Sequence, residues 1–153
     1  MNPISQLLTW FFADRPTTGK SLPDIAQMLQ ASARQVDDRI AAAADTPGSR
    51  FRLGHIIGIE RWGARRLRVA LGEPLEMDEM NGYMPNESTP LGIMRQDFAD
   101  TRRATVALVH ELEKRRVDPN KTVPHNQFGD YSVRQWLGYI YSHAGWDSRR
   151  LKR

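Results

Sequence analysis

Two side chains that can bind a metal ion lie one helical turn apart near the end of the chain. His143 and Asp147 are separated by four positions within residues 132–153, and residues at i and i+4 share one face of a helix. A third such side chain, His55, lies in another predicted helix, residues 51–71, whose apolar face also turns towards the core. The sequence therefore predicts one three-ligand site between two helices.

Two imidazoles and a carboxylate suit zinc or nickel, and also iron(II). Three protein ligands leave coordination positions for water or a substrate, as in catalytic metal sites. The spacing alone also fits a simpler interpretation. In it, His143 hydrogen-bonds a neighbour at the edge of the core, and Asp147 is solvated or pairs with Arg150 or Lys152.

Two further residues are weaker candidates for catalysis. Glu60 follows His55 by five residues, which is about 140° around a helix at roughly 100° per residue. We expect it to accept a hydrogen bond from a ligand or to form a salt bridge rather than to bind the same ion. His125 precedes the last helix and could reach the mouth of a pocket as an acid or base, although a solvated loop histidine is the simpler state. Tyr139 and Trp146 are candidates for the pocket entrance.

Composition narrows the class of protein. A chain of 153 residues can bury one core without cross-links, and the absence of cysteine excludes disulfides, thiolate metal sites and a cysteine nucleophile. The 22 basic and 18 acidic residues are interspersed over several helices, unlike the concentrated basic face of a nucleic-acid-binding protein. Long apolar runs and a secretory signal are not evident, so we expect a soluble, cytoplasmic protein that binds neither nucleic acid nor membrane.

The rest of the sequence predicts the helices that hold these side chains. Capping boxes, in which a serine and a side chain three residues later exchange hydrogen bonds, begin long helices at Ser21 and Ser132. Apolar residues recur at steps of three and four through residues 51–71 and again from Pro90 onward, the pattern of a helix that faces a bundle. We therefore expect an all-α protein in which residues 21–153 form a four-helix bundle.

A short amphipathic helix precedes this bundle. A cap at Asn2 opens it, and we expect it to run to Phe12 before residues 14–20 break it. Residues 1–15 are then an accessory helix within a single domain, residues 1–153. Because its apolar side chains need a partner, we expect it to pack across the bundle or to contribute to a homodimer.

Two long connections complete the predicted organisation. Residues 73–89 and 117–131 are rich in proline, glycine and asparagine, and they are too irregular to form long helices. The first is long enough to form a rim over a pocket. Neither contains a convincing strand pattern.

Two segments resemble the DinB/YfiT-like superfamily of metal-binding four-helix bundles. Residues 51–61 (FRLGHIIGIER) are similar to the family's second-helix pattern, in which a glutamate follows a histidine by five residues. Residues 128–137 (FGDYSVRQWL) lead into residues 143–147 (HAGWD) and are similar to the family's loop, helix start and HxxxH ligand pair. The resemblance covers nearly everything from Ser21 to the C-terminus.

The resemblance implies that His55 is the ligand from the second helix and His143 the first ligand from the last. Asp147 stands where most members have histidine, although a carboxylate ligand also occurs in the related mycothiol-dependent branch. It further implies a divalent metal ion that binds a low-molecular-weight thiol, lowers the pKa of that thiol and presents the thiolate to a small electrophilic substrate. The expected function is therefore that of a metal-dependent thiol transferase.

Two alternatives use the same residues differently. The ion could generate hydroxide for hydrolysis, which needs a separate acid or base, and only Glu60 and His125 are candidates for it. If aspartate in place of the family's histidine at position 147 had abolished metal binding, the bundle would instead bind a small ligand and catalyse nothing.

Overall fold

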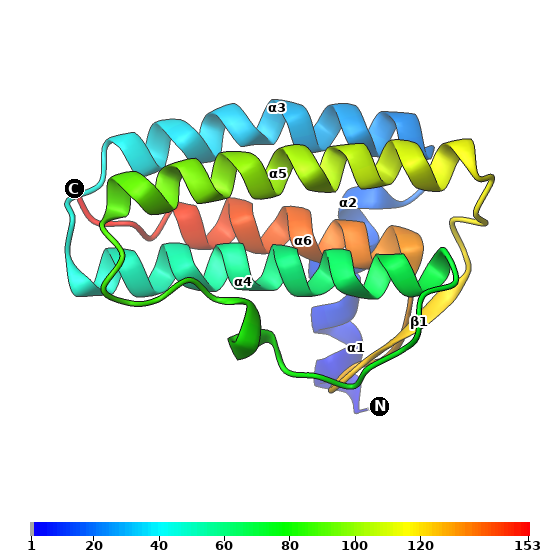
Figure 1. The fold of residues 1–153 in the computed structure, drawn as a ribbon. Coiled ribbons are helices and arrows are strands. Elements are labelled where there is room, and N and C mark those ends of the chain that lie inside the picture. The colour runs from blue at the N-terminus through cyan, green and yellow to red at the C-terminus, as the bar shows by residue number, and fades with distance from the viewer. Residues whose placement is uncertain (1) are drawn as a thin grey trace.

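Four long helices dominate the computed structural model, which describes residues 2–153 (Figure 1). They are α3 (Leu22–Ala41), α4 (Pro47–Ala70), α5 (Leu91–Lys114) and α6 (Val133–Ser148). Helices α3 and α4 each pack against both α5 and α6. The protein is therefore mostly helical, as expected, and each long helix buries its apolar residues against two neighbours. No helix within residues 2–153 has the length and apolar composition needed to span a bilayer.

The predicted capping boxes are present at both helix starts. The Ser21 hydroxyl accepts from the backbone N–H of Asp24, whose carboxylate accepts from the N–H of Ser21. Ser132 and Gln135 exchange the same pair of hydrogen bonds. Each box satisfies backbone donors that the first helical turn leaves without a partner.

Helix α4 begins four residues earlier than expected. The helix was expected from residue 51, but Thr46 caps it by accepting from the N–H of Ser49 at 3.1 Å, and Pro47 occupies the first helical position. Proline is well tolerated there because the missing N–H has no partner within the helix in any case.

The N-terminal segment stays helical beyond the break predicted at residues 14–20. Helix α1 (Pro3–Thr9) continues through a π-helical turn, η1 (Trp10–Asp14), into α2 (Arg15–Thr17). Proline clashes with the carbonyl four residues earlier in an α-helix. Here the N–H of Arg15 reaches back five residues to the carbonyl of Trp10, and this wider turn carries the helix past Pro16.

This segment packs on α6. The Gln135 side chain donates to Asp14 at 2.7 Å, and the Thr17 hydroxyl donates to the carbonyl of Arg134 at 3.0 Å. The two backbones lie close together at Gly138, where an added Cβ would overlap the carbonyl oxygen of Ala13. Glycine at this position of α6 is therefore a requirement of the docked segment.

The second long connection contains a small sheet that the sequence did not predict. Strands β1 (Thr122–His125) and β2 (Gly129–Ser132) pair antiparallel, with Val123 opposite Tyr131. The hairpin is held to α6 because the Trp136 indole donates to the carbonyl of Val123 at 3.0 Å. The prediction of no strand was wrong because each strand has four residues, too few to show alternation, and one contains Pro124.

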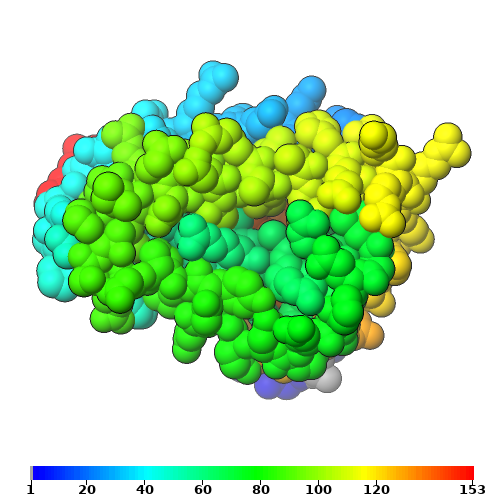
Figure 2. Space-filling view, in the orientation of Figure 1, coloured from blue at the N-terminus to red at the C-terminus, as the bar shows by residue number. Residues whose placement is uncertain are grey.

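The first long connection, residues 73–89, is irregular as expected except for one 3-10 turn, η2 (Met80–Tyr83). Figure 2 shows the green segment that includes this connection lying over α4 on the face drawn. Buried Arg66 of α4 holds it in place by donating to the carbonyl of Asp78 at 3.1 Å. The same guanidinium donates to the Asn126 side chain at 2.9 Å, so one residue ties α4 to this connection and to the hairpin.

Candidate metal centre

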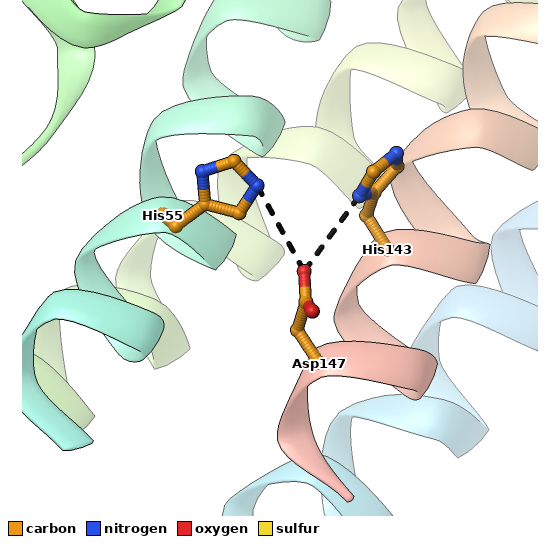
Figure 3. Close-up of side chains that lie close together, drawn as sticks. All are labelled: His55, His143 and Asp147. Atoms are coloured by element: carbon orange, nitrogen blue, oxygen red, sulfur yellow. Dashed lines mark ion pairs between the residues drawn. The ribbon is translucent and has the colours of Figure 1, made fainter. Parts of the chain in front are cut away.

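The three predicted ligands converge between α4 and α6 (Figure 3). One ligand atom from each of His55, His143 and Asp147 lies within 4.8 Å of the other two. The Oδ2 atom of Asp147 is 3.7 Å from Nδ1 of His143 and 3.9 Å from Nε2 of His55. The structure therefore brings together the three residues that the sequence predicted, although His55 and His143 are 88 positions apart in the chain.

Close packing of these two antiparallel helices positions the cluster. Gly63 of α4 faces Ile140 of α6, and a Cβ at this glycine would lie 2.8 Å from the Ile140 side chain. His55 lies two turns before Gly63, and His143 lies about one turn after Ile140. A glycine in the apolar face of α4 thus lets the two ligand-bearing turns face each other.

The carboxylate of Asp147 is the centre of a group of charges. Its side chain is only 11% exposed, so the alternative in which it is solvated does not apply. Its Oδ1 atom lies 3.7 Å from Arg52 and 4.0 Å from Arg150, the second of which is the ion pair considered from the sequence. One carboxylate oxygen therefore faces the histidines and the other faces the guanidinium groups.

These surroundings set the protonation of the cluster. Burial alone would raise the pKa of Asp147, but the nearby imidazole of His143 and the charges of His143, His55 and Arg52 together lower it. The pKa of His55 is lowered by burial, which outweighs the opposing effect of Asp147, and then by His143 and Arg52. An ionised carboxylate and a neutral imidazole are the forms that bind a metal ion.

The distances fit a divalent ion if the three side chains move closer together around it. Tetrahedral ligands about 2.1 Å from zinc lie about 3.4 Å from one another. The two separations from Asp147 exceed this by a few tenths of an ångström, and all three ligand atoms lie within 4.8 Å of one another. The donor set and its spacing are therefore compatible with a metal site.

Glu60 belongs to a different part of the core. Its side chain is buried, and both carboxylate oxygens accept from Arg102 of α5, at 2.7 and 2.8 Å. Arg102 also donates to the carbonyl of Leu29 and to Ser32 of α3. Of the two roles expected for Glu60, the structure has the salt bridge, and this residue offers no free base to the cluster.

His125 is buried, so its assignment as a solvated loop histidine was wrong. It lies in β1 among five aromatic rings, those of Trp62, Phe128, Tyr131, Trp136 and Tyr139. Its Nδ1 atom accepts from the N–H of Gln127 at 3.1 Å. Burial, followed by the charges of Arg66 and His143, lowers its pKa to about 4, so the ring is neutral near pH 7. The Tyr139 ring lies between it and the cluster, in contact with both His125 and His143.

The N-terminal segment contributes to the site, which the sequence analysis missed. Phe12 stacks on His143 with ring centroids 5.7 Å apart, and Trp146 packs edge-on against Phe12 at 6.1 Å. The predicted placement of Tyr139 at the pocket is also found, since its ring centroid lies 4.3 Å from that of His143. The apolar stripe that includes Leu8 and Phe12 signalled a buried face, but nothing in the sequence identified α6 as its partner.

A cavity of about 270 Å³ adjoins His143. Three separate segments line it: the N-terminal helix, the hairpin and α6. The lining residues are Leu8, Phe12, Gln127, Phe128, Tyr131, Tyr139 and His143. The candidate metal centre therefore has an apolar cavity beside one of its ligands, His143.

Comparison of the chain with protein-family models, curated proteins and solved structures finds no match. The fold and the site define a mostly helical protein with a His-His-Asp group that is compatible with a metal site.

Proposed function

We propose that this chain is a DinB-like four-helix bundle that holds a divalent metal ion at His55, His143 and Asp147 and activates a low-molecular-weight thiol for transfer to a small electrophile. The observation that carries the proposal is the convergence of these three ligand atoms within 4.8 Å. They are the residues that the resemblance assigns as ligands. The packing of α3 and α4 against both α5 and α6 supports the bundle.

Bound at this cluster, a divalent ion would act as a Lewis acid that favours the thiolate form of a thiol near neutral pH. The chain has no cysteine, so the thiol comes from a small molecule. Its sulfur donates an electron pair to an electrophilic carbon, a carbon–sulfur bond forms, and the leaving group departs with the pair of the broken bond. Arg52 and Arg150 flank Asp147 and favour a thiol that carries carboxylates.

The contacts of Glu60 and His125, the two weaker candidates for catalysis, favour thiol transfer over hydrolysis. A hydrolase needs an acid or base near the attacking water. Both oxygens of Glu60 accept from Arg102, and His125 is separated from the cluster by Tyr139. Neither is available as a base at the ligands, whereas a thiolate attacks without one.

Metal analysis of protein purified without an affinity tag tests the ligand set. We expect about one zinc or nickel ion per chain, and less than a tenth of that in His55→Ala and in His143→Ala. His110→Ala is the matched control, because His110 is exposed on α5 and lies outside the cluster. If the wild-type chain binds neither ion after incubation with it, this proposal is refuted. The alternative of a non-catalytic bundle that binds a small ligand then takes its place.

Thiol titration of the cobalt(II)-substituted protein tests the reaction class. We expect bacterial low-molecular-weight thiols to produce a sulfur-to-cobalt charge-transfer band, and His143→Ala to lose it. If no thiol changes the spectrum while esters or amides turn over in a metal-dependent way, the protein is a hydrolase instead.

A further inference from the structure

The cavity beside His143 has the lining of a site for an aromatic group. Five of its seven lining residues carry an aromatic ring or an imidazole, and Asp, Glu, Lys and Arg are absent from the set. Such a lining offers ring faces and edges but no charge, so it favours a neutral planar group over an ion.

The rings are arranged to contact a planar guest from several sides. Tyr131 and Tyr139 meet at 69° with centroids 5.9 Å apart, and Tyr139 meets His143 at 61°. Phe128 lies almost parallel to Tyr131, at 10°. Offset-stacked and edge-to-face contacts are the favourable geometries for aromatic pairs, and this wall presents both.

The volume sets the size of the guest. An apolar protein cavity of about 150 Å³ accepts benzene. The cavity here, about 270 Å³, therefore has room for one substituted ring or two fused rings.

One polar group can orient such a guest. The Tyr131 hydroxyl is engaged with Thr9 at 3.3 Å. The Tyr139 hydroxyl has no hydrogen-bond partner within residues 2–153, and the Tyr139 ring contacts His143. A polar substituent on the ring would therefore bind Tyr139 and lie on the side of the metal ligands.

We propose that this cavity binds the aromatic part of the electrophilic co-substrate, with the reactive carbon directed towards His143. The inference rests on the proposed function, because the electrophile is the second substrate of that reaction. It adds the substrate class: a neutral compound with one or two aromatic rings.

Fluorine NMR of 4-fluorobenzyl alcohol tests the cavity in the metal-free protein, independently of any reaction. We expect saturable line broadening by the wild type. Leu8→Trp, which fills the cavity from α1, should weaken binding at least fivefold, and adding Gln127→Trp from the hairpin should weaken it at least tenfold. Ile93→Trp is the control, because Ile93 of α5 is 58% exposed and does not line the cavity.

Competition then tests the aromatic preference. Indole should displace the fluorinated probe at least fivefold more effectively than cyclohexylmethanol does. Equal binding to wild type and the double tryptophan variant, or equal competition by the aliphatic alcohol, would overturn the inference.

Cobalt(II) at the cluster tests where the probe lies. Because the cavity adjoins His143, the bound fluorine should relax faster in the cobalt protein than in the zinc protein. Equal relaxation in a cobalt-loaded chain would place the probe elsewhere and overturn the inference. A chain that takes up no cobalt would refute the proposed function, and the metal-free titrations would still decide whether the cavity binds an aromatic ring.

Discussion

The ring of Phe12 stacks on the imidazole of His143, with centroids 5.7 Å apart and planes inclined by 25°. Phe12 lies in the π-helical turn of the N-terminal segment, and His143 lies in the last helix. A segment that looked accessory in the sequence thus covers one of the proposed metal ligands. Its attachment to α6 becomes a testable part of the site.

Two glycine substitutions on the same helix should have opposite effects. Gly138→Ala places a Cβ against the carbonyl of Ala13, and forcing the backbones apart should destabilise the protein by about 1–3 kcal/mol. Gly145→Ala has no atom within 4 Å of the new Cβ and should stabilise α6 by about 0.5–1 kcal/mol. Urea unfolding measures both. Equal effects would show that the segment does not depend on Gly138.

Removing the charge of Glu60 should destabilise the core without emptying the metal site. Glu60→Gln leaves Arg102 buried without its carboxylate partner, and breaking such a pair costs about 3–5 kcal/mol. Asp100→Asn, which breaks an exposed pair with Arg103, is the control and should cost at most about 1 kcal/mol. If Glu60→Gln lost the metal but kept its stability, the structural role of Glu60 would be contradicted. Glu60 would then belong to the metal site.

Stability of the metal-free protein should fall as the pH is lowered from 7 to 5. The pKa of His125 is lowered to about 4 in the folded protein, against about 6.5 when unfolded. Between these values the unfolded chain binds more protons, so stability rises with pH and acid favours unfolding. The contribution of His125 between pH 7 and 5 is about 2 kcal/mol.

Urea unfolding at both pH values, compared between wild type and His125→Phe, isolates this contribution. The variant should lose about 2 kcal/mol of the pH dependence, whereas His110→Phe should leave it unchanged. An identical slope in His125→Phe would mean that the buried ring does not titrate as stated.

The exposed side of the N-terminal segment should pair two copies of the chain. Ile4, Leu7, Trp10 and Phe11 remain exposed although the opposite side packs on α6, and an apolar patch of this kind marks an interaction surface. Sedimentation equilibrium should give twice the chain mass for wild type and the monomer mass for Leu7→Glu with Trp10→Glu. Ile93→Glu, an exposed apolar position on α5, is the control. A monomeric wild type would refute the pairing.

Local signals allowed much of this fold to be predicted. The capping boxes at Ser21 and Ser132 depend on residues three positions apart, and they were found as expected. The juxtaposition of His143 and Asp147 follows from helix geometry alone. The approach of His55 could be anticipated because its helix had an apolar face that needed a partner.

The missed features depend on contacts between distant segments. Burial of His125 results from aromatic neighbours on α4, the hairpin and α6, including Trp62 and Trp136. The stacking of Phe12 requires the π-helical turn and the close approach at Gly138. No local pattern shows which surface an amphipathic helix packs against. The cavity beside His143 could therefore not be predicted from the sequence.

Leu8 and Phe12 of the N-terminal segment form a wall of the cavity, and Phe12 also stacks on His143 of α6. Occupation of the cavity and opening of that segment are therefore thermodynamically linked, and the linkage is reciprocal. If a guest binds only when the segment is docked, then at about 100 times its dissociation constant it reduces the open population about 100-fold. Amide hydrogen exchange in α1 would slow by the same factor, so this segment would report which compounds enter the cavity before any reaction is known.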